Sequence, residues 1–340
     1  MLLSRAVIRA AALAGLLAAA ACSAPATPGE PPGPPPPPKP APPPPPPDPA
    51  EVGANELGDV PVLMYHRITP APTSVYDRTP EEFRAELERL ADEGYVPVTA
   101  TEYATGKIDI PAGKHPVVLT FDDGSASQFT LDPAGEPAPN TAIGILLSVA
   151  RKHPDFRPTA TLYVFDPPFE EPGGRHTLTW LHERGFEIGN HTVDHPNLGG
   201  ESATEVQREI AGMQRIINEA LPGVPVDSLA LPLGAHPDDE ALAADGSADG
   251  TTYHHSSVML VGSNPAPSPF TADFDPTAVP RIRSQGPTGE GADYGSTKWL
   301  DELAANPGTR YTSDGDPAKI SAPRSATAEP APDLPDLVRY

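Results

Sequence analysis

The chain has 340 residues, and its 46 acidic side chains outnumber its 23 lysines and arginines, so that the formal net charge is −23. A surface this acidic excludes nucleic acid and an anionic bilayer as the main partner, because both would repel it. The single cysteine, Cys22, excludes an intrachain disulfide.

The first 21 residues are typical of a secretory signal peptide. Arg5 and Arg9 precede an alanine- and leucine-rich run that ends in small residues at Ala21. This run is too short and too rich in alanine to favour a membrane-spanning helix. Cys22 lies where a bacterial lipoprotein is cleaved and lipidated. We therefore expect an exported cell-envelope lipoprotein, anchored by lipid at Cys22 to the outer face of the membrane; the alternative is cleavage at Ala21 and secretion.

A proline-rich linker is predicted after the signal, from residue 22 to residue 58. Residues 25–49 contain 17 prolines in 25 positions. Such a run favours polyproline II, which extends about 3.1 Å per residue. The segment is either a spacer that holds a domain away from its anchor or a disordered tether.

From residue 59 to residue 285, short apolar runs alternate with helix signals, which predicts one α/β domain. Thr79–Glu82 has the pattern of a capping box with proline at the first helical position, and the helix is expected to stop at Gly94. Ser202–Glu205 indicates a second helix start. Strands are predicted at 61–65, 96–99, 116–121, 159–165, 228–233 and 258–262.

Two adjacent acids end one of these strands. Pro116–Phe121 is apolar and β-branched, and Asp122, Asp123 and Gly124 follow it at the strand's C-terminal edge. Two neighbouring strand residues would point to opposite sides. Gly124 permits a turn that directs both carboxylates to one site.

His191 and His195 follow another short apolar stretch and are four residues apart. If the segment coils after Asn190, the two imidazoles lie on one helical face and bind one ion. Asp194 is a local candidate to accept a hydrogen bond from the second nitrogen of a ligand imidazole. One carboxylate and two imidazoles suit a divalent metal, and the second carboxylate is left to act as a base.

The string Thr120–Gly124 (TFDDG), followed by His191–His195 (HTVDH), resembles the first two motifs of polysaccharide deacetylases of the NodB-homology type, carbohydrate esterase family four. The resemblance covers about residues 59–285. It implies a single catalytic domain with a distorted (β/α) barrel of about seven strands. It further implies Asp122 as catalytic base and Asp123, His191 and His195 as ligands of a divalent metal, with zinc expected and cobalt or nickel as alternatives.

The later motifs depart from the family. Residues 230–234 (ALPLG) stand where the family has Arg-x-Pro-aromatic-Gly, so the missing arginine must be replaced; Arg281 resembles an arginine of a late strand and is expected to orient Asp122. The backbone N–H of Leu233 is expected to help hold an oxyanion. The family's late histidine is missing, because no histidine follows His255. Residues 62–66 (VLMYH) resemble the opening strand of the poly-N-acetylglucosamine branch, and His66 is therefore the expected general acid.

The resemblance implies metal-dependent removal of N-acetyl groups from an N-acetylglucosamine-containing polysaccharide of the cell envelope or of an exported polymer. The alternatives are an O-acetyl esterase and a catalytically silent wall-binding lipoprotein.

Two segments lie outside the motifs. Residues 125–140 are expected to form a loop near the cleft, which either shapes specificity through Gln128 or Phe129 or fills surface. The tail, residues 286–340, is expected to pack in its first part, around Trp299 and Leu300, and to be disordered beyond it.

Overall fold

The computed structural model of the protein describes residues 47–334 and 337–340. The predicted signal peptide (1–21), the predicted lipidated Cys22 and nearly all of the proline-rich run lie outside the described residues. Within them, no helix combines the length and the apolar character needed to cross a membrane.

A parallel sheet of eight strands forms the centre of residues 47–340. Seven strands follow the order β10-β1-β3-β4-β5-β6-β9. The eighth strand, β2, pairs with the N-terminal half of β3, whereas β4 pairs with the C-terminal end of β3. Bridges between Met259 and Val279 and between Gly262 and Ile282 connect the two ends of this order, so the sheet curls round on itself. The prediction of a distorted (β/α) barrel with about seven strands is confirmed. The strands are β1 Val62–Tyr65, β2 Tyr95–Val98, β3 His115–Phe121, β4 Thr161–Val164, β5 Glu187–Asn190, β6 Ser228–Ala230, β9 Ser257–Met259 and β10 Ile282–Arg283.

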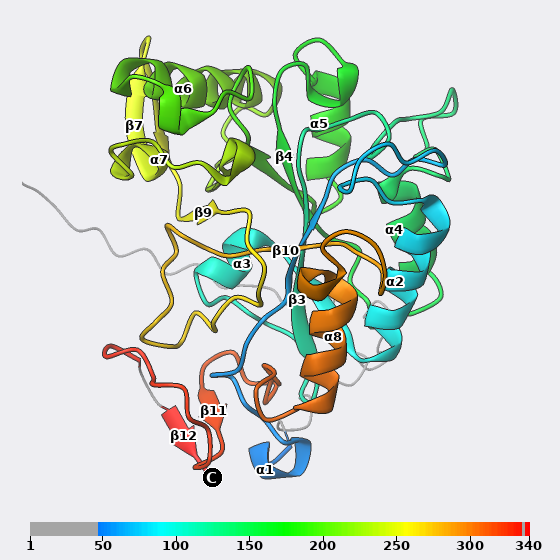
Figure 1. The fold of residues 1–340 in the computed structure, drawn as a ribbon, viewed down its shortest axis with the longest axis vertical. Coiled ribbons are helices and arrows are strands. Elements are labelled where there is room, and N and C mark those ends of the chain that lie inside the picture. The colour runs from blue at the N-terminus through cyan, green and yellow to red at the C-terminus, as the bar shows by residue number, and fades with distance from the viewer. Residues whose placement is uncertain (1–46, 335–336) are drawn as a thin grey trace, which may run out of the picture. The chain divides into compact units, whose positions relative to one another are not determined.

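The longer helices cover the outer side of the curled sheet (Figure 1). The capping box at Thr79 and Glu82 is formed and starts α2, and the side chain of Ser202 caps the N-terminus of α6. The helices are α1 Pro49–Val52, α2 Pro80–Asp92, α3 Ala100–Ala104, α4 Ala142–Ala150, α5 Arg175–His182, α6 Ala203–Ala220, α7 Ala241–Ala244 and α8 Ser296–Ala305. Single 3₁₀ turns are η1 Pro168–Glu170, η2 Leu198–Gly200, η3 Pro232–Gly234 and η4 Ala292–Tyr294. An antiparallel hairpin, β7 Asp245–Ala248 with β8 Thr251–His254, lies beside α6.

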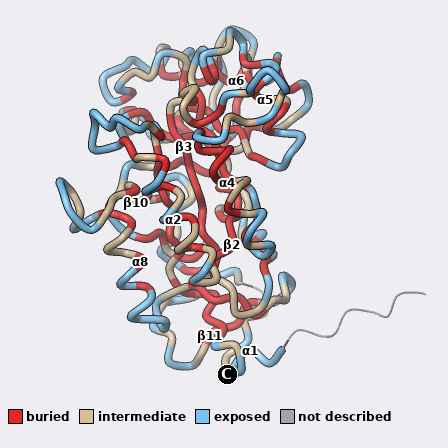
Figure 2. Tube along the Cα trace, turned by 90° about the vertical axis from the view of Figure 1, so that its right-hand side faces the viewer, coloured by how far each residue is buried: buried red, intermediate tan, exposed pale blue. Residues whose placement is uncertain are grey.

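The central strands are buried along most of their length (Figure 2), and their two faces pack in different cores. Along β3, Leu119 and Phe121 pack in the core beneath the helices, whereas Val118 belongs to the core inside the barrel. Side chains of a strand alternate in direction. Thr120 therefore faces inward as well, and its hydroxyl donates to the carbonyl of Leu63 on β1. This alternation places the next inward position, Asp122, at the rim of the barrel where β3 ends.

The folded part of the chain begins earlier and ends later than predicted. Helix α1 and residues 54–58 belong to the packed structure, not to a linker, because Glu56 N–H donates to the carbonyl of Ser321 and Asn55 pairs with Thr312. The described residues of the tail beyond α8 are ordered, contrary to our expectation: Tyr311 is buried, and β11 Ile320–Ala322 pairs with β12 Leu337–Arg339. Isolated apolar residues and three-residue strands leave no periodic pattern in a sequence, so these elements escaped prediction.

The buried carboxyl of Glu56 joins the two ends of the described chain. It accepts hydrogen bonds from the N–H of Ser321 at 2.7 Å and of Asp314 at 3.3 Å. Burial raises its pKa to about 7; the N–H of Ser321 opposes this shift, and the charge of Asp314 adds to it. A raised folded-state pKa means that the associated stability is fully present below the ordinary value of 4.5 and is lost as the pH rises through about 7.

Glu56→Gln removes this titration. The unfolding free energy of the variant, relative to that of the native protein, should therefore rise by about 2 to 3 kcal/mol between pH 4.5 and pH 8. Urea unfolding of both proteins across this range measures the difference. A difference that does not change with pH would show that Glu56 is ionised throughout.

Candidate metal centre and active site

The polar residues singled out in the sequence gather at the C-terminal rim of the barrel. Asp122 and Asp123 follow β3, His191 follows β5, and His66 follows β1. Parallel strands all end at the same rim, which is where such barrels carry their functional groups. Arg281 lies just before β10 and reaches the same place from the barrel interior.

Asp122 and Arg281 form a buried two-pronged ion pair. The two guanidinium Nη atoms donate to the two carboxylate oxygens of Asp122 at 2.6 and 2.7 Å, and the side chain of Arg281 is fully buried. Burial alone raises the pKa of Asp122, but the charge and hydrogen bonds of Arg281, together with the nearby His191 and His66, outweigh burial and hold this pKa well below its usual range. Asp122 is therefore a carboxylate whose orientation and charge are both fixed at neutral pH.

Asp123, His191 and His195 present one ligand atom each, and these three atoms all lie within 4.8 Å of one another. Asp123 Oδ1 is 3.6 Å from His191 Nε2 and 3.7 Å from His195 Nε2. Ligands of a tetrahedral ion with bonds of about 2.0–2.1 Å lie about 3.3–3.5 Å apart, so the set matches a zinc-type ion. Asp123 adopts a positive φ of 78°, which separates its direction from that of Asp122 and aims it at the two imidazoles.

The histidine segment is a loop, and our expectation of a helical face was wrong. Residues 191–195 have no helical assignment, and Thr192 and His195 have φ values of 67° and 54°. Such a conformation is strained for a β-branched residue and persists only where neighbours enforce it. Here the carboxamide of Asn190 accepts from the N–H of Thr192, and Glu209 on α6 accepts from the N–H groups of Val193 and Asp194.

The tautomer of His191 is set by the strand next to it. Its Nδ1 lies 2.8 Å from the carbonyl oxygen of Ala230 on β6. A carbonyl oxygen only accepts, so Nδ1 carries the proton and Nε2 has its lone pair free for a metal. Asp194, the acceptor proposed from the sequence, does not take this role, because its backbone is held by Glu209 and its side chain is exposed.

His66 lies beside Asp122 at the edge of the site. Its Nε2 is 3.9 Å from Oδ2 of Asp122, and its ring contacts that of Tyr76 with centroids 4.8 Å apart. Burial lowers the pKa of His66 despite the opposing charges of Asp122 and Asp123. Its Nδ1 is buried without a hydrogen-bond partner among the described residues. The imidazole is thus neutral near pH 7 and borders the cavity.

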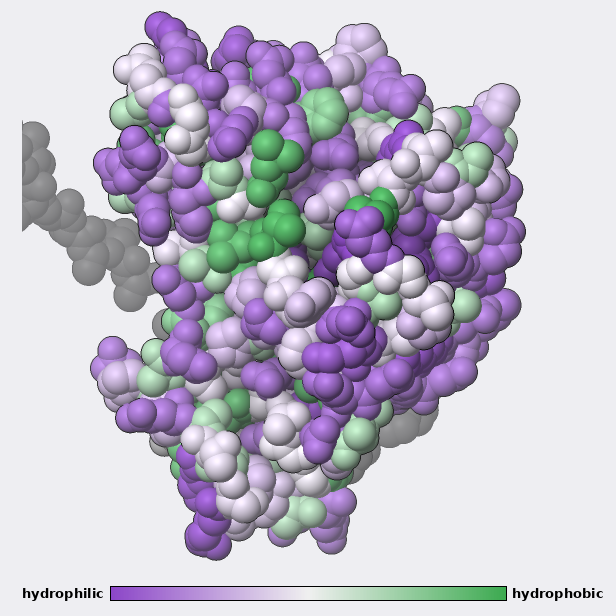
Figure 3. Space-filling view, viewed as in Figure 1, coloured by the Kyte–Doolittle hydropathy of each residue, from purple (hydrophilic) through white to green (hydrophobic). Residues whose placement is uncertain are grey.

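A cavity of about 450 Å³, which we call the site cavity, opens above these residues. Leu233 lies at its wall in η3, with a φ of 58° and an exposed fraction of 66%. Among the described residues, the backbone N–H groups of Gly234 and Ala235 donate to carbonyls of the same turn, whereas that of Leu233 has no such partner and is available to a ligand. Figure 3 shows hydrophobic side chains gathered on the face where β9 and β10 lie. Leu233 and Val261 are both exposed apolar residues, and both line the site cavity.

The loop at residues 125–140 supports the site from beneath, not by contacting the cavity through Gln128 or Phe129. Phe129 is fully buried against Phe169 and Trp180. The amide nitrogen of Gln128 donates to the backbone carbonyls of His66 and Asp122 and so ties the ends of β1 and β3 together. Neither side chain is exposed, so the alternative in which they shape substrate specificity directly is wrong.

Comparison with known proteins adds an independent finding. Residues 109–248 match the family model of polysaccharide deacetylases. A putative polysaccharide deacetylase of Bacillus subtilis is 25% identical over 196 residues, which cover 55% of this chain and 61% of the relative. A chitooligosaccharide deacetylase of Sinorhizobium fredii is 28% identical over 127 residues, which cover 37% of this chain and 51% of the relative. The chain thus matches less than two thirds of the length of either relative.

Solved structures show the same fold. A putative polysaccharide deacetylase from Bacillus anthracis aligns with a TM-score of 0.53 and 20% identity, over 70% of this chain and 69% of its own. A protein named IcaB from Ammonifex degensii aligns with a TM-score of 0.50 and 20% identity, over 73% of this chain and 96% of its own.

Proposed function

This chain belongs to the polysaccharide deacetylase family, and from that membership we propose that it hydrolyses N-acetyl groups of an N-acetylglucosamine-containing polysaccharide in a metal-dependent reaction. The observation that carries the proposal is the pair of adjacent acids with separate partners. Asp122 is held by Arg281, whereas Asp123 faces His191 and His195. A protein that only bound glycan would need no fixed, fully charged carboxylate beside a ligand set for a metal.

Asp123, His191 and His195 are the residues that would hold the metal, for which zinc fits the mixed nitrogen and oxygen ligands, with cobalt and nickel as alternatives. When bound at three protein ligands, such an ion acts as a Lewis acid and lowers the pKa of water to about 7. Asp122 is the proposed acceptor of a proton from the attacking water. The N–H of Leu233, at the wall of the site cavity, is the proposed donor to the oxygen that becomes negative during the attack.

His66 is the proposed source of the proton for the leaving nitrogen. It is neutral at rest because burial lowers its pKa, so it must first gain a proton. Asp122, whose Oδ2 lies 3.9 Å from His66 Nε2, provides a short path for that transfer. His66 therefore takes over the role of the histidine that the C-terminal part of the sequence lacks.

We expect His66→Ala to lower turnover by about 10² or more without loss of metal, because general acid catalysis contributes that much. Steady-state rates and metal content per chain measure both effects. His254→Ala, which changes an exposed histidine on β8, is the matched control. Full turnover of the His66 variant with metal bound would remove His66 from this role.

The proposed substrate is consistent with the expected location of the protein and with its acidic surface. An exported lipoprotein anchored through Cys22 would meet N-acetylated polysaccharide in the cell envelope or during export. Its acidic surface tolerates a neutral glycan and suits a product that becomes cationic when acetate leaves.

Acetate release from a panel of acetylated glycans tests the proposal. We expect release from N-acetylglucosamine oligomers by the protein as purified, its loss after chelation and dialysis, and its return when zinc is added. Paired substrates that carry the acetyl group on nitrogen or on oxygen separate a deacetylase from an O-acetyl esterase. Release from the oxygen-linked substrate alone would favour the esterase. The absence of release from every glycan, with metal bound, would favour a silent wall-binding protein.

A further inference from the structure

A second hollow adjoins the site cavity and contains an arginine that the proposed chemistry does not use. We call it the arginine pocket; it has a volume of about 250 Å³ and is lined by Met64, Tyr76, Val261, Arg283 and Tyr294, among others. Tyr76 and Val261 also line the site cavity, so the two hollows lie side by side. A ligand longer than one sugar ring that enters the site cavity therefore has a defined neighbouring place to occupy.

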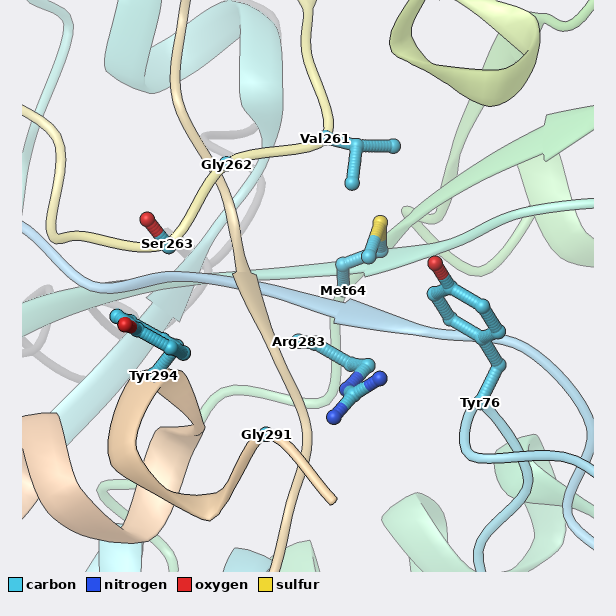
Figure 4. A pocket seen from close by; sticks show the side chains of 8 residues that line it. All are labelled: Met64, Tyr76, Val261, Gly262, Ser263, Arg283, Gly291 and Tyr294. Carbon is cyan, nitrogen blue, oxygen red and sulfur yellow. The ribbon is translucent and has the colours of Figure 1, made fainter.

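Strand alternation sends Arg283 into this pocket. Arg283 lies two residues after Arg281, so both side chains leave the same face of the chain at β10. Arg281 points into the barrel interior toward Asp122, whereas Arg283 lies at the rim. Figure 4 shows its guanidinium extending toward Tyr76, with Tyr294 on the opposite side.

The guanidinium is held in place but keeps donors free. Its Nη2 donates to the carbonyl of Glu290 at 2.6 Å, and its carbon lies 5.4 Å from the centre of the Tyr76 ring. Gly291 makes room for it, because a Cβ at that position would lie 2.1 Å from Nη2. No carboxylate of the described residues pairs with Arg283. The chain has 46 acids against 23 lysines and arginines, so most arginines have an acid available to pair with. A half-buried arginine that faces a groove without such a partner indicates that the groove binds an anionic ligand.

The remaining lining suits a sugar ring. Tyr294 has an exposed fraction of 62%, Val261 of 42% and Tyr76 of 38%, so aromatic and apolar surface faces the solvent round the arginine. Exposed aromatic and apolar side chains that cluster round a hollow are typical of a ligand-binding surface. The arginine adds a fork of donors that matches a carboxylate.

From this geometry we propose that the arginine pocket binds the sugar next to the one that is deacetylated, and that Arg283 pairs with a carboxylate carried by that sugar, as in N-acetylmuramic acid. This inference rests on the proposed function and narrows it. It selects a polymer in which an N-acetylated sugar alternates with a carboxylated one, over a neutral polymer of N-acetylglucosamine. The positive charge of Arg283 is the feature that favours the carboxylated polymer over the neutral one.

Binding of two matched ligands tests the proposal without relying on turnover. One ligand is an oligosaccharide of alternating N-acetylglucosamine and N-acetylmuramic acid, and the other is the same oligosaccharide with its carboxyls reduced to alcohols. Calorimetry on the zinc-loaded full chain with Asp122→Asn, which prevents hydrolysis, gives both dissociation constants. Arg283→Gln in that background should weaken binding of the carboxylated ligand about five- to tenfold and change that of the reduced ligand less than about twofold.

Two further variants separate the arginine from its surroundings. Arg215→Gln removes an equal charge from an exposed position on α6 and should change neither constant. Tyr294→Ala should weaken both ligands, because it removes ring contact and leaves Arg283 in place. The proposal is overturned if Arg283→Gln affects both ligands equally, if it affects neither, or if the native pocket binds the reduced ligand as tightly as the carboxylated one.

The outcome for the proposed function is read separately, from acetate release by the native protein. Selective weakening in Arg283→Gln without any acetate release would leave the pocket as a carboxylated-sugar site and reject the deacetylase. Acetate release with no selective weakening would keep the deacetylase and reject the pocket.

Discussion

Asp122→Asn should lower acetate release by at least about 10³ while the protein keeps its metal. The asparagine has nearly the same shape and can still accept one hydrogen bond from Arg281, but it cannot take a proton from water. General base catalysis contributes about 10² to 10⁴, and the lost charge also leaves the guanidinium of Arg281 without a counter-ion at the site. Rates measured at saturating substrate, with metal content determined on the same samples, give the result.

Asp77→Asn is the matched control for this variant. Asp77 is a buried aspartate that lines the same cavity and pairs with Arg67 at 2.6 Å, and no hydrogen bond or ion pair joins it to the three metal-site residues. We expect it to lower stability and to leave turnover within about tenfold of the native value. More than a tenth of native turnover in Asp122→Asn would mean that the base is another group.

Arg281→Met should destabilise the fold by about 3 to 5 kcal/mol, because it leaves the carboxylate of Asp122 buried without a partner. The methionine fills much of the space of the arginine stem, so the loss comes mainly from the uncompensated charge. Urea unfolding at neutral pH measures it. Turnover should fall as well, since the carboxylate loses the two hydrogen bonds that orient it.

A double variant shows whether the charge is the cause. Arg281→Met with Asp122→Asn should be more stable than Arg281→Met alone, because a neutral amide costs less to bury than a carboxylate. If the double variant loses the sum of the two single losses, the ion pair is not the source of the effect, and packing around residue 281 explains the instability.

The sequence predicted those helices and strands whose start or course is determined by neighbouring residues in the chain. The capping box at Thr79 and Glu82 gave the start of α2, and the apolar run before Asp122 gave β3. Helix α4 was not predicted, since its residues 142–150 (AIGILLSVA) are apolar on nearly every side and show no amphipathic period. Such a helix is recognised only once its surroundings are known to bury it.

The same division applies to the site. The two sequence motifs identified Asp122, Asp123 and the two histidines as site residues. The family resemblance predicted that Arg281 lies beside Asp122. The groups that fix these residues were missed: Ala230 binds His191 across 39 residues, Glu209 holds the histidine loop across 16, and Gln128 reaches His66 across 62. A backbone carbonyl, a helix glutamate and a buried amide carry no motif, and only the folded chain brings them together. The loop conformation at Thr192 depends on these contacts, and the helical expectation failed for that reason.

The central claim is that Asp123, His191 and His195 form one metal site. Titration of metal-free protein with zinc, followed by calorimetry, tests it most directly. We predict one zinc ion per chain in the native protein, the same stoichiometry and a similar affinity in Asp122→Asn, and an affinity at least about 100-fold lower in His191→Ala. Zinc bound as tightly by His191→Ala as by the native chain, or not bound by the native chain at all, would contradict the account.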